Sequence, residues 1–177
     1  MTTYISLLRG VNVGGKNRVK MDVLTAMYES MGFSRVRAYI QSGNVLFDSA
    51  DMDTGRLQRE IEGKMMSVLG LDLRVLIRTR DELRDVIGRN PFGQEFNDRL
   101  YIAFLSAAME NPPMDALNKL KDEREQFVIS GKEIFIYYYN GAGRTKFSNA
   151  ALEKKLGAVS TMRNWNTVNQ LAAMSGE

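Results

Sequence analysis

The sequence predicts an α+β fold, in which short strands alternate with amphipathic helices. Short apolar runs bounded by glycine, serine and asparagine recur along the chain, as is typical of strands and tight turns. Between them lie longer segments whose apolar residues repeat at helical spacing. Two pairs of strand-like runs are separated only by the turn-forming segments QSGN and SGK, which predicts hairpins and antiparallel sheets.

In the first half of the chain the predicted order is strand, helix, strand, strand, helix, strand, helix. A glycine-rich loop follows the first strand, and the two middle strands flank QSGN. Thr79 is placed to cap the last helix, which ends before Pro91. The six elements before that helix are expected at residues 4–8, 21–31, 36–40, 45–47, 51–69 and 73–77.

The second half repeats this order. Both halves also contain a Leu-Gly pair followed by an arginine, a capping residue and an apolar helix. The elements are expected at residues 100–105, 114–121, 126–129, 134–139, 149–156, 159–162 and 167–174. We therefore predict two ferredoxin-like β-α-β-β-α-β units with antiparallel sheets, packed in one compact chain. The first covers residues 1–90 and carries the glycine-rich basic loop, and the second covers residues 91–177 and ends in a C-terminal helix.

Composition is that of an ordinary globular protein, with 44% hydrophobic and 25% charged residues. No apolar stretch approaches the length of a membrane span, and the first nine residues are too short for a signal peptide. We therefore expect a cytoplasmic protein that makes no contact with a membrane.

Cysteine and histidine are both absent from the sequence. This excludes a disulfide framework, a thiolate nucleophile, a histidine triad and a zinc site of the usual nitrogen and sulfur type. No acidic cluster has the spacing of a calcium loop. We therefore expect neither a metal site nor a cofactor.

Positive charge is gathered in two segments that are distant in the sequence. Residues 1–21 contain four basic residues and no acidic residue, and residues 140–177 contain five basic and two acidic residues. The net charge is only +3 because acidic residues dominate elsewhere, as in residues 110–133. If the fold brings the two segments together, they form a basic concavity suited to an anion.

The loop RGVNVGGKN, residues 9–17, has the glycine and lysine spacing of a phosphate-binding loop. The NTPase pattern needs Ser or Thr after the lysine to hold magnesium, whereas Asn17 stands there. The following helix also starts too late, and hairpins argue against a parallel sheet, so we expect no NTPase loop. Gly10, Gly14 and Gly15 still allow backbone N–H groups to approach an anion while Lys16 and Arg18 supply charge. The alternative is a mobile loop with solvated bases.

Three further polar clusters are candidates for the same site. They are the turn 41–44, the segment around Lys146 before a predicted helix, and STMRNWNT, which contains Arg163. Each has a plain structural alternative: a tight turn, a helix cap, and an asparagine cap such as Asn164 beside a packed Trp165. The candidate ligand-binding residues are Arg9, Asn12, Gly14, Gly15, Lys16, Gln41, Ser42, Asn44, Lys146, Arg163 and Asn164.

Three segments, YISLLRGVNVGGKNRVKM, VRAYIQSGNVLFDS and TMRNWNTV, resemble hallmark segments of an uncharacterised bacterial family designated domain of unknown function 1697. The resemblance spans essentially the whole chain and implies a two-part α+β fold with a ferredoxin-like unit. It implies no established activity or substrate, so the matching residues carry over as motif positions only. These positions are Arg9, Asn12, Gly14, Gly15, Lys16, Gln41, Ser42, Gly43, Asn44, Arg163, Asn164 and Trp165.

The interpretation we favour is a protein that binds a phosphorylated or carboxylated small molecule, nucleotides included, at the basic loop between the two units. Lys16 and the loop amides would hold one oxyanion, and Arg9 or Arg163 would clamp it. Neutral groups of the ligand would be read by Asn12, Gln41 and Asn44. No residue stands out as a general base, so the sequence names no catalytic residue and leaves open whether the protein is an enzyme.

Two alternatives stay open. The first unit has the strand and helix order of an RNA-recognition sheet, with an exposed face that would include Tyr4, Arg37, Tyr39, Arg74 and Arg78. The strand NVLFD lacks paired stacking aromatics, however, and a net charge of +3 is small for a nucleic-acid binder. The second alternative is a protein-interaction module without catalysis, using the tyrosines at positions 137–139 unless Tyr138 simply faces the core.

Overall fold

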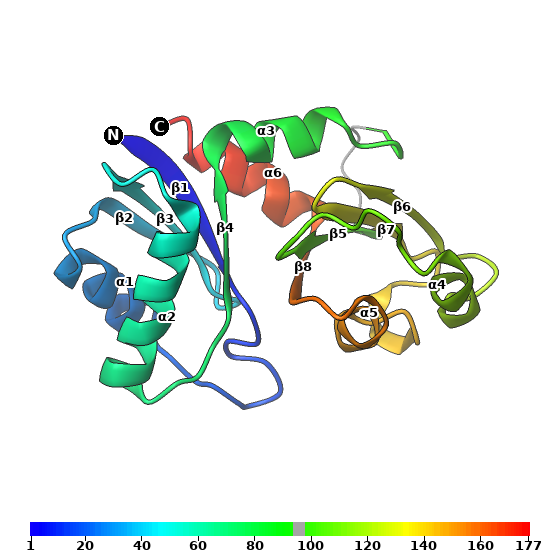
Figure 1. Ribbon diagram of the computed structural model, residues 1–177, viewed down its shortest axis with the longest axis horizontal. Coiled ribbons are helices and arrows are strands. Elements are labelled where there is room, and N and C mark those ends of the chain that lie inside the picture. Colours follow the sequence, from blue (N-terminus) through cyan, green and yellow to red (C-terminus); the bar gives the residue numbers. More distant parts are fainter. Residues whose placement is uncertain (94–97) are drawn as a thin grey trace. The chain divides into compact units, whose positions relative to one another are not determined.

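The structure is a computed structural model that describes residues 1–93 and 98–177. The described residues form two compact units, one made of Met1–Arg84 with Leu171–Glu177 and the other of Asp85–Gln170. Each unit contains one four-stranded sheet with helices packed on it (Figure 1). In the described part of the chain, no helix combines the length and the apolar character needed to cross a bilayer.

The first half of the chain follows the predicted order of elements. Its sheet has the strand order β2-β3-β1-β4, and all its neighbouring strands are antiparallel. The elements are β1 (Thr2–Leu8), α1 (Met21–Ser30), β2 (Ser34–Tyr39), β3 (Asn44–Ser49), α2 (Thr54–Leu69), β4 (Val75–Thr79) and α3 (Arg80–Gly88).

The second half repeats both the order and the pairing. Its sheet has the order β6-β7-β5-β8, again fully antiparallel, so each strand has a counterpart in the first sheet. The prediction of two ferredoxin-like units with antiparallel sheets is confirmed. The elements are β5 (Leu100–Leu105), α4 (Met114–Leu120), β6 (Gln126–Ser130), β7 (Glu133–Tyr137), the short 3₁₀ helix η1 (Ala142–Arg144), α5 (Asn149–Leu156), β8 (Ser160–Asn164) and α6 (Trp165–Met174).

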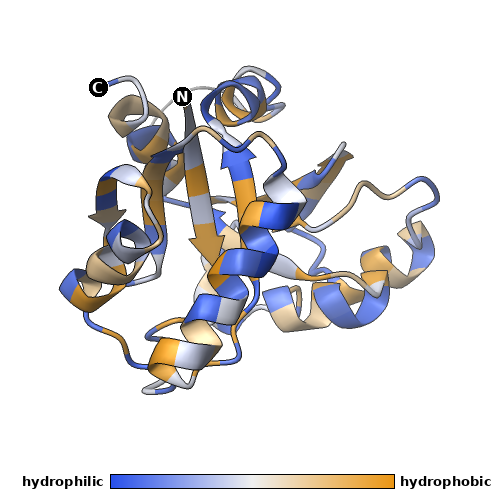
Figure 2. Ribbon diagram, turned by 60° about the vertical axis from the view of Figure 1, so that its left-hand side comes forward, coloured by the Kyte–Doolittle hydropathy of each residue, from blue (hydrophilic) through white to orange (hydrophobic). Residues whose placement is uncertain are grey.

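The core of the first unit lies between its sheet and the helices α1 and α2. The helices are amphipathic, and Figure 2 shows apolar and polar residues alternating along them. The apolar face of α2 packs into this core through the buried Leu57, Ile61 and Met65. Aromatic rings fill its centre, with Phe47 4.5 Å from Phe33 between ring centroids.

The core of the second unit has the same layout with different side chains. Leu117 of α4 and Leu152 of α5 pack on the sheet together with Tyr138 and Phe147. The Tyr138 hydroxyl donates to the carbonyl oxygen of Phe147 at 2.6 Å, which satisfies the polar end of a buried ring. Tyr138 thus faces the core, opposite to the exposed Tyr139, as its alternation in the strand predicts.

Helix ends explain the sequence pattern shared by the two halves. The Leu-Gly pairs are helix C-termini, because Gly70 after α2 and Gly157 after α5 both adopt the left-handed conformation, with φ of 65° and 64°. Thr79 and Glu82 form a reciprocal capping box at α3. Ser148 caps α5 through the backbone N–H of Ala151.

Most element boundaries differ from the prediction by one to three residues, and three of these differences have a clear local reason. The helix expected from residue 51 begins at Thr54, because the Asp53 side chain caps it. β2 ends at Tyr39, because Ile40 has a φ of +50° and cannot continue a strand. α6 begins at Trp165 rather than near 167, because Asn164 accepts a hydrogen bond from the backbone N–H of Thr167.

Candidate functional site

The glycine-rich loop folds into a small hairpin rather than a phosphate-binding loop. The backbone N–H of Lys16 donates to Val13 at 3.0 Å across the two-residue turn Gly14-Gly15. Both glycines have positive φ, 58° and 75°, which a tight hairpin turn of this kind requires. The N–H of Lys16 is therefore already paired inside the loop, as is the N–H of Asn12 with the carbonyl oxygen of Asn17.

Asn12 ties this hairpin to the rest of the first unit. Its Nδ2 donates to the carbonyl oxygens of Val19 at 3.0 Å and Gln41 at 2.9 Å, and its Oδ1 accepts from the N–H of Val19. The backbone of Asn12 has a φ of +54°, a conformation that asparagine tolerates better than most residues. Because both amide protons are engaged, Asn12 positions the loop against the turn that contains Gln41.

The turn between β2 and β3 is closed just as tightly. A Cβ added to Gly43 would lie 2.9 Å from the Cβ of Leu8 and 3.1 Å from that of Val11, so only glycine fits. Asn44 is buried, and its Nδ2 donates to the carbonyl oxygen of Tyr39 and to the hydroxyl of Ser42. Ser42 and Asn44, which are both predicted site residues, therefore hold the shape of this turn.

A hollow of about 880 Å³ lies beside the hairpin, the turn and the start of α1, and we call it the glycine-loop hollow. Three predicted residues line it: Asn12, Gly15 and Gln41. The remaining lining residues are Arg18, Val19, Lys20, Met21 and Asp22. The structure therefore brings the loop and the QSGN turn together within one unit.

Two further basic residues line this hollow: Arg18, which is expected to supply charge together with Lys16, and Lys20, which is outside the predicted set. Both are exposed, and neither forms an ion pair with any described residue. Lys20 is the N-cap residue of α1 and supplies no side-chain cap. The positive end of the α1 dipole therefore adds to the charge of the two side chains, offset in part by Asp22. The signal that could have identified Lys20 is the basic run directly before a helix start.

Five predicted residues of the first unit lie outside the lining of this hollow: Arg9, Gly14, Lys16, Ser42 and Asn44. Lys16 is exposed at the base of the hairpin turn. Arg9 is partly buried directly after β1, where its backbone N–H donates to the carbonyl oxygen of Arg74.

In the second unit, Arg163 and Asn164 have structural roles. Asn164 caps α6, and the adjacent Trp165 is buried. The Arg163 guanidinium is buried in β8 and donates through Nη1 to the Thr161 hydroxyl and the Met162 carbonyl oxygen. Burial lowers the pKa of Arg163 to about 10. These contacts orient a charged group that stands among polar residues in the sequence.

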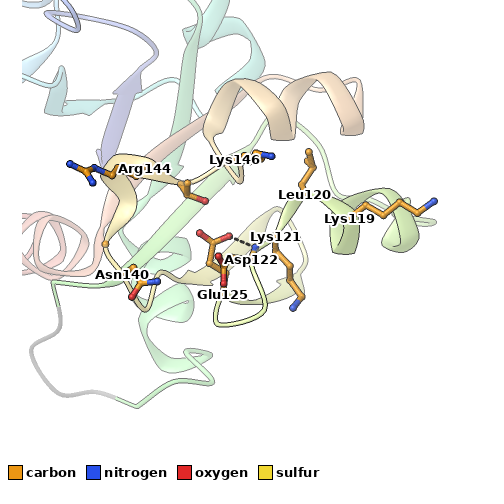
Figure 3. A pocket seen from close by; sticks show the side chains of 10 residues that line it. Lys119, Leu120, Lys121, Asp122, Glu125, Asn140, Arg144 and Lys146 are labelled. Atoms are coloured by element: carbon orange, nitrogen blue, oxygen red, sulfur yellow. Dashed lines mark hydrogen bonds between the residues drawn. The ribbon is translucent and has the colours of Figure 1, made fainter.

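Lys146 lines a second hollow, of about 680 Å³, formed by the end of α4 and the segment before α5 (Figure 3). We call it the α4–α5 hollow. The lining also contains Lys121, Arg144, Asp122 and Glu125. Within the described ranges, no group of three or more carboxylates is placed to hold a metal ion.

The expectation of an exposed RNA-binding face is wrong at two of its residues, because Tyr4 and Arg78 are both buried. Tyr4 lies on the helix-covered side of the first sheet, stacked on Phe47 at 5.6 Å between ring centroids. Arg37 is engaged within the unit, where Nη2 donates to the Met174 carbonyl oxygen at 2.7 Å and Nη1 pairs with Glu177. Tyr4 and Arg37 lie on opposite faces of the sheet. Tyr4 pairs with Phe47 and Arg37 pairs with the adjacent Leu46, and adjacent residues of a strand point to opposite faces.

Comparison with known proteins agrees with this fold and with the sequence motifs of the first unit. The family model described as "Protein of unknown function (DUF1697)" matches residues 1–135. The chain belongs to this family. Asn12, Gly43 and Asn44 of this DUF1697 protein, which shape the loop and the turn, all lie in the matched region, whereas TMRNWNTV lies beyond it.

A solved structure also resembles this DUF1697 protein over nearly its full length. It is the "conserved bacterial protein SP0830 from Streptococcus pneumoniae", with a TM-score of 0.69 and 24% identity over 98% of each chain. This similarity supports the fold and carries no information on activity. No curated protein matches the chain.

Proposed function

We propose that the first unit binds a phosphorylated or carboxylated small molecule in the glycine-loop hollow. The observation that carries the proposal is the pair Arg18 and Lys20, two exposed cations without ion-pair partners among the described residues, at the start of a helix that lacks a side-chain cap. An anion there gains two charge-assisted hydrogen bonds and the favourable end of the helix dipole.

The neighbouring residues have separable tasks in this proposal. The exposed Gln41 side chain lines the hollow and offers both a donor and an acceptor to a neutral group of the ligand. Asn12 does not touch the ligand but fixes the distance between hairpin and turn through its three hydrogen bonds. Gly15 leaves space beside Arg18, because a Cβ on Gly15 would lie 3.5 Å from the Arg18 Nη2.

The volume and the charge of the glycine-loop hollow indicate the class of ligand. The hollow is large enough for a nucleotide or sugar phosphate, and its net charge excludes simple cations. The proposal is one of binding and assigns no catalytic role to Asp22, which is the one carboxylate among the lining residues.

The test is a titration followed by ¹⁵N NMR with inorganic phosphate, pyrophosphate, AMP, citrate and a short single-stranded RNA. Arg18→Ala should weaken binding of the small anions by about tenfold, the cost of one charge-assisted hydrogen bond pair. Arg59→Ala on α2 is the matched control, because it removes an equal charge from an exposed position outside the hollow.

The outcomes separate the candidate functions. Shifts at residues 12–22 that depend on Arg18 support the proposal, whereas equal affinity in the Arg18 and Arg59 variants contradicts it. Binding of the RNA alone, with a steep loss of affinity as salt increases, would instead indicate a nucleic-acid surface.

A further inference from the structure

We propose a second binding site in the second unit, at the α4–α5 hollow, for a small molecule that carries both an amino group and an anionic group. The site places the buried carboxylate of Glu125 among basic residues, with Lys121 and Lys146 on its two bordering segments. It is independent of the proposal for the first unit, since it uses none of the same residues.

Glu125 is the acceptor at the centre of this site. Only 7% of the residue is exposed, yet its side chain lines the hollow. One oxygen, Oε2, accepts from the backbone N–H of Asp122 at 2.9 Å. A carboxylate offers about four acceptor positions, so most of its capacity remains for a donor that enters the hollow. No ion pair within 4.0 Å neutralises Glu125 in the described part of the chain.

The bases around the hollow come from two segments. Lys119 and Lys121 stand at the end of α4, and Arg144 and Lys146 precede α5. None of the four has an ion-pair partner among the described residues. In Figure 3 the Lys119 and Arg144 side chains both point away from the two carboxylates, and Lys119 serves as the comparison for Lys146.

This mixture of charges selects the class of ligand. A simple anion would be attracted by the lysines but repelled by the negative charge of Glu125. A simple amine would be attracted by Glu125 but repelled by the lysines. A molecule with an ammonium group and an anion a few bonds apart satisfies both. Thr145 can assist, since its Oγ1 accepts from the N–H of Phe147 and keeps its own proton to donate to the anion.

The experiment compares three probes by ¹⁵N NMR titration of the full chain. Phosphoethanolamine carries both groups, inorganic phosphate carries only the anion, and ethanolamine carries only the amine. We expect phosphoethanolamine to shift residues 119–125 and 140–146 with at least about tenfold higher affinity than either single-group probe, since each charged contact contributes about that factor.

Variants then assign the two ends of the ligand. Glu125→Gln keeps an acceptor for the Asp122 N–H but loses the charge, and should weaken phosphoethanolamine by about tenfold without weakening phosphate. Lys146→Ala should weaken both, and Lys119→Ala neither. If Glu125→Gln alters the spectrum beyond its neighbours, the surface pair Lys146→Ala and Lys119→Ala carries the test alone.

Three results would overturn the inference. The first is phosphate binding as tightly as phosphoethanolamine, and the second is equal affinity in the Lys146 and Lys119 variants. The third is an absence of shifts in both segments at millimolar probe. Shifts confined to residues 12–22 would likewise remove this site while supporting the first one.

Discussion

The two units share one topology but carry their hollows on different connections. The glycine-loop hollow is built on the β1–α1 connection, residues 9–20, whereas the α4–α5 hollow is built on the β7–α5 connection, residues 138–148, and the end of α4. Because β7 is antiparallel to β5, its connection leaves the opposite end of the equivalent sheet. The same scaffold thus presents concave sites at either end.

The difference lies in the connections rather than in the sheets. The β1–α1 connection contains two adjacent glycines and four basic residues, whereas its counterpart, residues 106–113, contains two prolines and no base. Conversely, the β3–α2 connection has four residues, and its counterpart β7–α5 is long enough to include η1. Repeated cores with divergent loops are how one fold acquires different binding surfaces.

The largest expected contrast is between the turn glycines of the two units. Gly43→Ala should lower the unfolding free energy by about 3 kcal/mol, because it adds a close contact with Leu8 to the strain of a positive φ. Gly131→Ala, in the equivalent β6–β7 turn, should cost only about 1 kcal/mol, since its nearest neighbours lie 3.9 Å away. Denaturant unfolding of both variants measures the difference, and equal losses would contradict the steric explanation.

The next effect concerns the asparagine that shapes the basic loop. Asn12→Ala should destabilise the protein by about 2 kcal/mol, because it removes three hydrogen bonds and an asparagine suited to φ of +54°. Asn17→Ala is its control, with one exposed hydrogen bond to Gly10 and a similar φ. The NMR spectrum of Asn12→Ala should change at Gln41. An unchanged Gln41 signal would contradict the proposal that Asn12 positions the loop against the turn.

A third comparison uses one buried tyrosine from each unit. Burial raises the pKa of Tyr28 and of Tyr138 well above their ordinary value near 10, and the charge of Glu125 adds to the effect at Tyr138. The folded state therefore keeps two protons that the unfolded state loses above pH 10, so stability falls as pH rises. Each tyrosine should contribute a loss of about 1.4 kcal/mol by pH 11.

The tyrosine contributions can be separated by substitution. Tyr28→Phe and Tyr138→Phe should each make the loss of stability between neutral pH and pH 11 smaller than in the parent protein. Denaturation at both pH values gives this difference directly, and tyrosinate absorbance gives the titration of each ring. A loss as steep as the parent's in both variants would show that the two hydroxyls do not titrate as their burial indicates.

The smallest contrast is between two helix caps. Thr79→Ala breaks a reciprocal capping box, and Ser148→Ala breaks a single cap at 3.2 Å. We expect losses of about 1.5 and 0.7 kcal/mol, measured by thermal unfolding. A larger loss for Ser148→Ala would mean that the capping box adds nothing to a single cap.

Sequence patterns predicted the elements well because the signals for them are local. Thr79, Ser148 and the two Leu-Gly pairs mark helix ends through neighbours within a few residues. The site depends instead on pairings between distant residues. The hydrogen bond between Asn12 and Gln41 joins residues 29 positions apart. No local pattern shows that the Asn12 amide already donates to this partner and is unavailable to a ligand.

Burial is the other quantity that local patterns miss. Arg163 stands among polar residues in the sequence, yet strand β8 places it in a buried position. Arg18 and Lys20 show the reverse, since their basic run is visible but its position beside a hollow requires the folded turn at Gln41. Charge can be counted from the sequence, whereas its exposure depends on tertiary structure.

The contacts of Arg37 with Met174 and Glu177 have a consequence for the folding of the newly synthesised chain. The first unit includes residues 171–177, so its folding cannot be complete when residue 84 has been synthesised. A ribosome adding about 5–20 residues per second needs on the order of 4–17 s to make the intervening segment. During that interval the Arg37 guanidinium lacks the two partners that hold it in the complete fold, the Met174 carbonyl oxygen and the Glu177 carboxylate.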